Sequence, residues 1–130
     1  MVTREDVVNF LNRMEMEFEE VAEGMWLAHP QEEEGTPLVI SYAPPVLVFR
    51  LKVLDVPNDG RKCTDLYRQL LESNARDLVH ASYALEEDDV ILTESMELEN
   101  LDFSEFQATV DSFQMALATQ MDKLAPFRDC

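Results

Sequence analysis

Glycine, cysteine and basic side chains are all scarce in this chain of 130 residues. Three glycines are too few to build the loop that cradles nucleotide phosphates. The two cysteines, Cys63 and Cys130, allow at most one bridge and show no repeated spacing, which predicts a reduced, intracellular protein. No stretch approaches the roughly eighteen apolar residues of a membrane span, and the N-terminus lacks the apolar run of a signal peptide. We therefore expect a soluble, cytoplasmic protein.

The shortage of positive charge also limits the classes of partner. Ten Lys and Arg stand against 27 Asp and Glu, which gives a net charge of −17. Nucleic-acid binding depends on neutralising phosphates, so this surface argues against a nucleic-acid partner. It argues equally against an anionic membrane face. The charge favours a basic partner, or it serves only to keep a small protein soluble.

What is present is enough for one folded domain spanning residues 1–130. Apolar residues make up 46% and charged residues 28%, which is typical of a globular protein. A chain of this length buries about two-thirds of the surface that its unfolded form exposes, so it needs neither a metal nor disulfides to fold.

The first segment has helical spacing. Thr3 is a good N-cap, and the carboxylate of Asp6 suits the first turn of a helix. The pattern predicts one helix that continues to Val21 and ends at Gly24. Its apolar positions are Val7, Leu11, Met14, Phe18 and Val21.

Three predicted strands follow, over 25–29, 38–43 and 46–55, with an acidic loop at 31–37 and a break at Pro44-Pro45. The third strand places Leu47, Phe49, Leu51 and Val53 on one face. A second helix is then expected, with Thr64 as its cap, ending near Asn74.

The last part predicts a hairpin followed by a long helix. Strands at 80–85 and 90–98 flank the acidic turn 86–89. Asp102 or Ser104 is expected to open the final helix. Its core stripe is Phe106, Val110, Phe113, Leu117, Met121 and Leu124. The whole order is α-β-β-β-α-β-β-α, an α+β fold in which helices pack on an antiparallel sheet of about five strands.

No reaction signature emerges from the sequence. Cys63 follows Arg61 and Lys62, which would favour a thiolate, but Arg68 lies at the wrong spacing for a cysteine phosphatase. His29 and His80 stand far apart without ligand spacing. The acidic runs 32–34 and 86–89 lack the alternation and glycine of a calcium loop. We therefore expect no catalytic residue, no metal and no cofactor.

Charge is unevenly distributed along the chain. Residues 50–76 hold six basic and four acidic residues, a net +2, so the remainder carries −19. A near-neutral middle suits self-association, because two copies at −17 would otherwise repel each other. A solvated basic face on the sheet is the alternative. Seven methionines favour core filling, with a plastic binding surface as the alternative.

Two segments carry a family resemblance: VFRLKVLDVP, and DLYRQLLESNARDLVHASYALEEDDVILTESMELENLDFSEF with the helix after it. They resemble the YbjN-like proteins, which form one superfamily with the CesT-type type III secretion chaperones. The resemblance covers about residues 46–124. It implies a secretion chaperone-like fold, an acidic homodimer and no enzyme activity.

The resemblance also implies where partners bind. In the chaperone branch the second helix and an adjacent strand form the dimer interface. Carried onto this chain, the interface positions are Leu66, Tyr67, Leu70, Leu71, Val79, Ala81 and Tyr83. A client segment would add a strand to a sheet edge and dock apolar side chains in grooves. The YbjN branch implies instead a regulatory protein, sensory or stress-related, that acts through one folded partner.

Overall fold

The computed structural model describes residues 1–29 and 37–128, and within them three α-helices and six strands. The helices are α1 (Arg4–Arg13), α2 (Gly60–Arg76) and α3 (Phe103–Leu124), with a short 3-10 turn at Ala125–Phe127. The strands are β1 (Glu17–Ala22), β2 (Met25–His29), β3 (Leu38–Ala43), β4 (Val46–Asp55), β5 (Ser82–Glu86) and β6 (Asp89–Glu97). The acidic run 32–34 and Cys130 lie outside the described residues.

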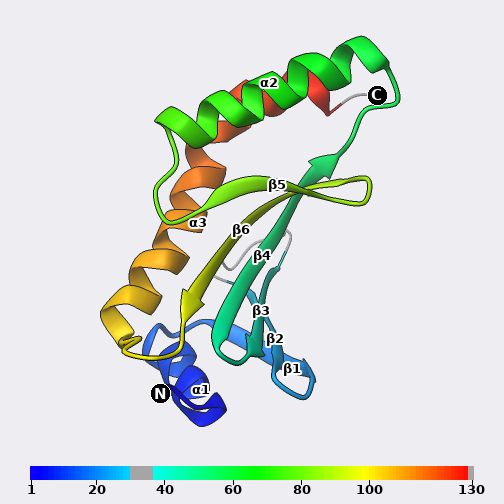
Figure 1. Cartoon of the computed structure of the whole chain (residues 1–130). Helices are drawn as coiled ribbons and strands as arrows, with labels where there is room; N and C mark the ends of the chain where they lie inside the picture. Colours follow the sequence, from blue (N-terminus) through cyan, green and yellow to red (C-terminus); the bar gives the residue numbers. More distant parts are fainter. Residues whose placement is uncertain (30–36, 129–130) are drawn as a thin grey trace.

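All six strands form one antiparallel sheet in the order β1-β2-β3-β4-β6-β5, so β1 and β5 are its edges. Figure 1 shows α3 running along the sheet, with α1 near its N-terminal end and α2 lying across the opposite end of the molecule. The predicted α+β class is confirmed, but the sheet has six strands rather than about five.

The extra strand comes from the N-terminal segment, where the predicted helix was too long. α1 ends at Arg13, and Glu15 turns the chain with a φ of 57°. Phe18 and Val21 then lie in β1, which pairs with β2. A two-residue turn containing Gly24 at φ 74° joins the two strands. Apolar residues three apart fit a helix face, but the segment pairs instead with β2, which satisfies the backbone groups on its inner side.

Side-chain caps set where the helices begin. The Thr3 hydroxyl accepts from the Asp6 N–H, and the Asp6 carboxylate accepts from the Thr3 N–H at 2.9 Å, which lowers the pKa of Asp6. Asp102 caps α3 by accepting from the N–H of Glu105. The sequence predicted the Thr3 cap, and Asp102 was one of the two residues predicted to open the last helix.

The start of α2 was predicted too late. Asp59 is its N-cap, because the Asp59 carboxylate accepts from two backbone N–H groups of the first turn. Thr64 lies inside the helix, and its hydroxyl donates to the carbonyl of Gly60 at 3.1 Å. The helix also continues past Asn74 to Arg76. The expected strands 25–29, 38–43 and 46–55 are all confirmed.

The core lies between one face of the sheet and the helices. Trp26, Ile40 and Phe49 are in register on β2, β3 and β4, and all three are fully buried. From α3, Phe106 and Phe113 contact Phe49, with ring centroids 5.6 and 6.1 Å away. This aromatic cluster fixes α3 on the sheet, since such rings bury large apolar areas.

Two expected core positions differ from the structure. A register shift between Lys52 and Leu54 places Leu54 in the core and leaves Val53 half-buried. A β-bulge inserts a residue and so changes which side chains face inward. On α3, Met121 is 49% exposed although it was expected on the core stripe, whereas Gln120 is buried.

A chain of polar contacts explains why Gln120 points inward. Tyr83 Oη donates to Gln120 Oε1 at 3.3 Å, and Gln120 Nε2 donates to Asp77 Oδ2 at 3.3 Å. Lys123 Nζ also donates to Asp77 Oδ2, at 2.5 Å. Lys123 and then Gln120 lower the pKa of Asp77, while burial raises the pKa of Tyr83. These contacts tie the end of α2 to β5 and α3.

We expect the variant Asp77→Asn to be destabilised at neutral pH and nearly unaffected in strong acid. The pKa of Asp77 in the folded chain lies below its ordinary value of 3.8. The ionised carboxylate therefore stabilises the fold at any pH above that value, and this contribution disappears as the pH falls through the lowered pKa. Urea unfolding of both proteins at pH 7 and at a series of progressively lower pH values tests this, because the difference between them should shrink as the Asp77 carboxylate is protonated. An equal shift of the midpoint at every pH value would contradict it.

Candidate protein-binding surfaces

The β1 edge of the sheet is open within the described part of the chain. Among residues 1–29 and 37–128, β1 forms a ladder with β2 only, and no strand of those ranges lies on its outer side. All of its residues except Phe18 are exposed. An unpaired edge presents backbone N–H and C=O groups that an extended segment of another chain can use.

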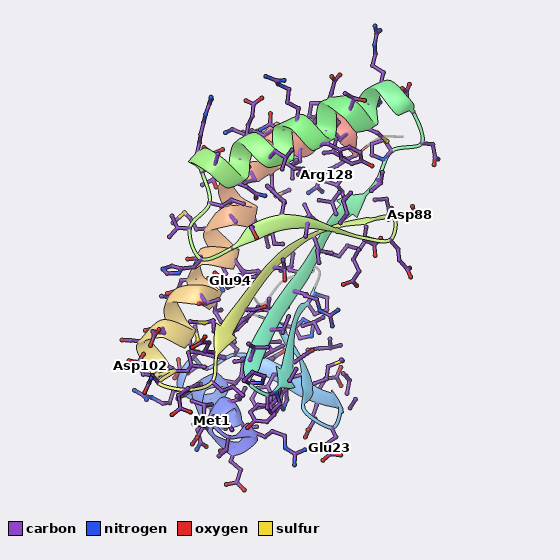
Figure 2. All side chains as sticks on the ribbon, viewed as in Figure 1. Met1, Glu23, Asp88, Glu94, Asp102 and Arg128 are labelled. Atoms are coloured by element: carbon purple, nitrogen blue, oxygen red, sulfur yellow. The ribbon has the colours of Figure 1, made fainter. Side chains whose placement is uncertain are left out.

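A groove of about 760 Å³ lies between α1 and the β1–β2 hairpin. One side comes from Arg4, Glu5, Val8 and Asn9 on α1, and the other from Glu20, Glu23 and Trp26. Figure 2 shows Glu23 at the tip of this hairpin. The groove is therefore next to the open edge, so one segment could use both.

An ion pair between two lining residues joins α1 to the hairpin. Arg4 donates to the Glu23 carboxylate at 2.6 Å, and this contact raises the pKa of Arg4. The Glu20 carboxylate accepts from the N–H of Gly24 at 3.0 Å. The first contact joins the hairpin to α1, and the second braces the turn within the hairpin. Since the Arg4 and Glu23 side chains are largely exposed, their pairing contributes little to stability.

Trp26 forms the buried part of the groove lining. Its side chain is 1% exposed, and the indole Nε1 is buried without a hydrogen-bond acceptor among the described residues. Most buried polar groups in proteins have a partner. The indole N–H of Trp26 instead lies in the core beneath the groove, out of reach of solvent.

The opposite edge of the sheet is capped by α2. Asn74 Oδ1 accepts from the Tyr83 N–H at 2.7 Å, and Asn74 Nδ2 donates to the Tyr83 carbonyl at 3.3 Å. The side-chain amide of Asn74 thus occupies the N–H and the carbonyl of Tyr83, with which an incoming strand would form hydrogen bonds on β5. Strand addition is therefore favoured at β1.

We expect Asn74→Ala to lower the free energy of unfolding by about 2 kcal/mol, because two hydrogen bonds to partly buried backbone groups are lost. Urea denaturation measures the change. Asn9→Ala is the matched control, since Asn9 is an exposed helix residue, and it should change stability by less than about 0.5 kcal/mol. Equal effects of the two substitutions would show that the Asn74 contacts are not important.

The seven predicted interface residues fall into two groups. Leu66, Leu70, Ala81 and Tyr83 are buried in the core of the single chain. Tyr67, Leu71 and Val79 are exposed, at 37%, 69% and 67%. Tyr67 and Leu71 lie one turn apart on the same side of α2, and Val79 follows in the loop to β5. These three are exposed apolar side chains on α2 or just after it, and we call them together the α2 surface.

The other candidate residues do not converge. Cys63 lies in the first turns of α2, where its thiol donates to the Pro57 carbonyl at 2.8 Å. His29 ends β2, and His80 lies in the loop before β5 with a φ of 58°. Among the described residues no three His, Cys, Asp or Glu side chains are placed to hold a metal. No helix in those ranges has the length and apolarity to cross a bilayer.

Sequence reasoning missed the groove because it assigned β1 to a helix. One signal was that Phe18 lies between two exposed glutamates, Glu17 and Glu19. In addition, Glu23-Gly24 separates the two strands by two residues, the commonest hairpin length. The part played by Arg4 had no local signal, because its partner Glu23 lies 19 residues away.

Comparison with known proteins identifies the family. The sequence matches the CesT_Tir_1 family over residues 2–129, so this chain belongs to it. The resemblance to the YbjN-like and CesT-type superfamily is thereby confirmed. No curated protein gives a significant match.

Several solved structures share the fold at low sequence identity. A chain of the heterodimeric ExoU–SpcU complex, from the type III secretion system of Pseudomonas aeruginosa, has a TM-score of 0.68 and 15% identity. The match covers 93% of this chain and 96% of that one. YbjN from E. coli, a proposed transcription regulator, has a TM-score of 0.67 and 13% identity, covering 94% and 93%.

A third structure is the type III secretion chaperone SycH of Yersinia pestis, which was solved with a stable fragment of a second protein. It has a TM-score of 0.62 and 14% identity, with 90% of this chain and 98% of that chain covered. At these identities the likeness shows a shared fold over nearly the whole of each chain.

Proposed function

We propose that this protein is a cytoplasmic, chaperone-like binding module that acts as a homodimer and holds a segment of a protein partner. It acts by binding alone, without catalysing a reaction. The segment pairs with the outer edge of β1 and places side chains in the groove beside α1. The three exposed apolar residues of the α2 surface join the two copies.

The observation that carries the client site is the position of the groove next to the open β1 edge. The edge offers backbone hydrogen bonds and the groove offers side-chain contacts, which together make up strand addition. Other chains of this fold have been solved as complexes with proteins: ExoU with SpcU, and SycH with its bound fragment. Membership of the family supports the same kind of use here.

The dimer rests on the α2 surface and on the charge distribution. Leu71 and Val79 are exposed apolar side chains, and burying them between two copies would stabilise the dimer. They lie in or next to the near-neutral segment 50–76, where two copies repel each other least. The β1 edge and the groove beside α1 stay free for the partner segment.

We expect Val8→Lys to weaken capture of the partner about ten-fold or more, because a long charged chain then occupies the groove. The experiment is an affinity pull-down from the source cell, with mass spectrometry to identify the captured protein. Leu85→Lys is the control, since it puts the same charged side chain at an exposed apolar position of β5, away from the groove and from the α2 surface. Hydrogen exchange of the complex should show added protection at residues 4–9 and 17–26. Unchanged capture by Val8→Lys would place the partner elsewhere.

The second candidate is a regulatory protein that acts on one folded partner. The observation in its favour is that YbjN has nearly the same TM-score as the matched chain of the ExoU–SpcU complex, 0.67 against 0.68. The net charge of −17 argues that such regulation proceeds through a protein rather than through direct DNA contact. The two candidates differ in the state of the partner. A chaperone-like module binds an isolated, unfolded fragment as well as the intact protein, whereas a regulator needs the folded form.

A further inference from the structure

A second hollow lies where the loop after α2 meets α3, on a different part of the molecule from α1 (Figure 1). Its volume is about 100 Å³. One wall is the loop from Asp77 to Val79, and the other comes from α3 and includes Met115, Ala116 and Thr119. We call this hollow the α3 groove. Val79 and Met115 are 67% and 65% exposed, so two apolar side chains in its lining remain in water.

The walls of the α3 groove come from two uncharged stretches of a highly charged chain. Residues 78–85 and 112–121 contain no Asp, Glu, Lys or Arg, although these four types make up 28% of the sequence. Asp77, which also lines the groove, is paired with Lys123. Two copies that each carry −17 repel each other over most of their surfaces. They repel each other least where both present an uncharged wall.

Two polar groups in the lining already have hydrogen-bond partners within the chain. Thr119 Oγ1 donates to the Met115 carbonyl at 2.9 Å. Asp77 Oδ2 accepts from both Gln120 and Lys123. Burying a polar group costs free energy chiefly when its hydrogen bonds are lost. A second protein surface can therefore cover the α3 groove without leaving these two groups unpaired.

We propose that a second copy of this chain covers the α3 groove, and that Met115 of each copy fills the groove of the other. A two-fold dimer uses the same surface on both copies, so this contact occurs twice. Methionine suits the role, because its unbranched side chain adapts to an irregular hollow. Val79 belongs both to the α2 surface and to the lining of the groove, so the interface continues from α2 onto α3. The inference rests on the dimer of the proposed function and adds α3 to its interface.

Met115→Ala is expected to raise the dissociation constant of the dimer about ten-fold or more, because each copy loses an apolar side chain buried in the other. Sedimentation equilibrium over a range of concentrations measures this constant. Met121→Ala is the matched control, since it removes the same side chain from another exposed position of α3 that does not line the groove. It should leave the constant unchanged. Circular dichroism should show both variants folded, because both side chains are exposed in the single chain.

A crosslinking experiment tests the contact directly. In chains whose Cys63 and Cys130 are replaced by serine, Met115→Cys places a single thiol in each copy. A short bismaleimide should join two such chains, because each Met115 lines its own groove while it fills the other. Met121→Cys in the same background is the control and should give little crosslinked product.

Three results would overturn the inference: a Met115→Ala dimer as tight as wild type, equal weakening by Met115→Ala and Met121→Ala, or no crosslink through Met115→Cys. Loss of partner capture by Met115→Ala with an unchanged dimer would also overturn it, because a client would then occupy the groove.

Failure of the proposed function is distinguishable from these results. If Leu71→Asp separates the copies and Met115→Ala does not, the α2 surface is the interface and only its extension onto α3 is wrong. If wild type is a monomer, the proposed dimer is itself wrong, and the contact through the α3 groove is wrong with it.

Discussion

Replacing Phe106 by alanine is expected to lower the free energy of unfolding by about 3–5 kcal/mol. Phe106 is fully buried, and its ring lies 5.3 Å from that of Phe10 and 5.6 Å from that of Phe49, measured between centroids. It therefore joins α1, the sheet and α3 in one contact. Removing the ring loses its transfer free energy and leaves a cavity that three elements cannot fill together. Because a domain is stable by only about 5–15 kcal/mol, the variant should be close to unfolding.

Urea denaturation followed by circular dichroism measures this loss. Phe106→Leu is the conservative comparison and should recover most of the stability, because it restores most of the buried volume. Phe103→Ala is the positional control. Phe103 contacts Phe10 at 5.8 Å and lies under the Arg13 guanidinium at 3.8 Å, but it is only half-buried. A loss no larger for Phe106→Ala than for Phe103→Ala would show that the cluster does not join the three elements.

The second large effect concerns two leucines five residues apart on α2. Leu66→Asp should prevent folding, because Leu66 is fully buried and the new carboxylate would have no partner in the core. Leu71→Asp should fold normally, since Leu71 is 69% exposed. If the α2 surface joins two copies, Leu71→Asp converts the dimer into a monomer, because it puts like charges against each other in the interface.

Circular dichroism separates the folded from the unfolded variant, and sedimentation equilibrium at micromolar concentration gives the mass. Wild type should sediment at twice the chain mass of 15.0 kDa and Leu71→Asp at the chain mass itself. Leu85→Asp is a useful control, because Leu85 is also exposed but lies on β5. A wild-type monomer, or a Leu71→Asp variant that stays dimeric, would contradict the proposed dimer.

Most of the elements could be predicted from local pattern. The strands 25–29, 38–43 and 46–55 alternate or carry dense apolar runs, and the caps Thr3 and Asp102 mark helix starts by satisfying free N–H groups. The N-terminal segment failed because Phe18 and Val21 are spaced three apart, which suits a helix. Their actual state depends on the neighbouring strand β2, a contact that the helical spacing does not report.

The candidate site was predicted only in part. The resemblance supplied the family and pointed to α2 and β5, but it did not separate the buried residues Leu66 and Tyr83 from the exposed Leu71. The groove could not be found without the structure, because it exists only where α1 meets the β1–β2 hairpin. The capping of the β5 edge by Asn74 likewise depends on the packing of α2 against β5.

The sequence by itself determined the composition-dependent properties: a strongly negative surface, an apolar core, and most helix and strand positions, all of which follow from residue identity and spacing over a few residues. Only the tertiary structure decided which sheet edge is open, which α2 leucines face water and which carboxylates gather beside Trp26. The physical reason is that burial and pairing depend on elements brought together from distant parts of the chain, and no local pattern contains that arrangement.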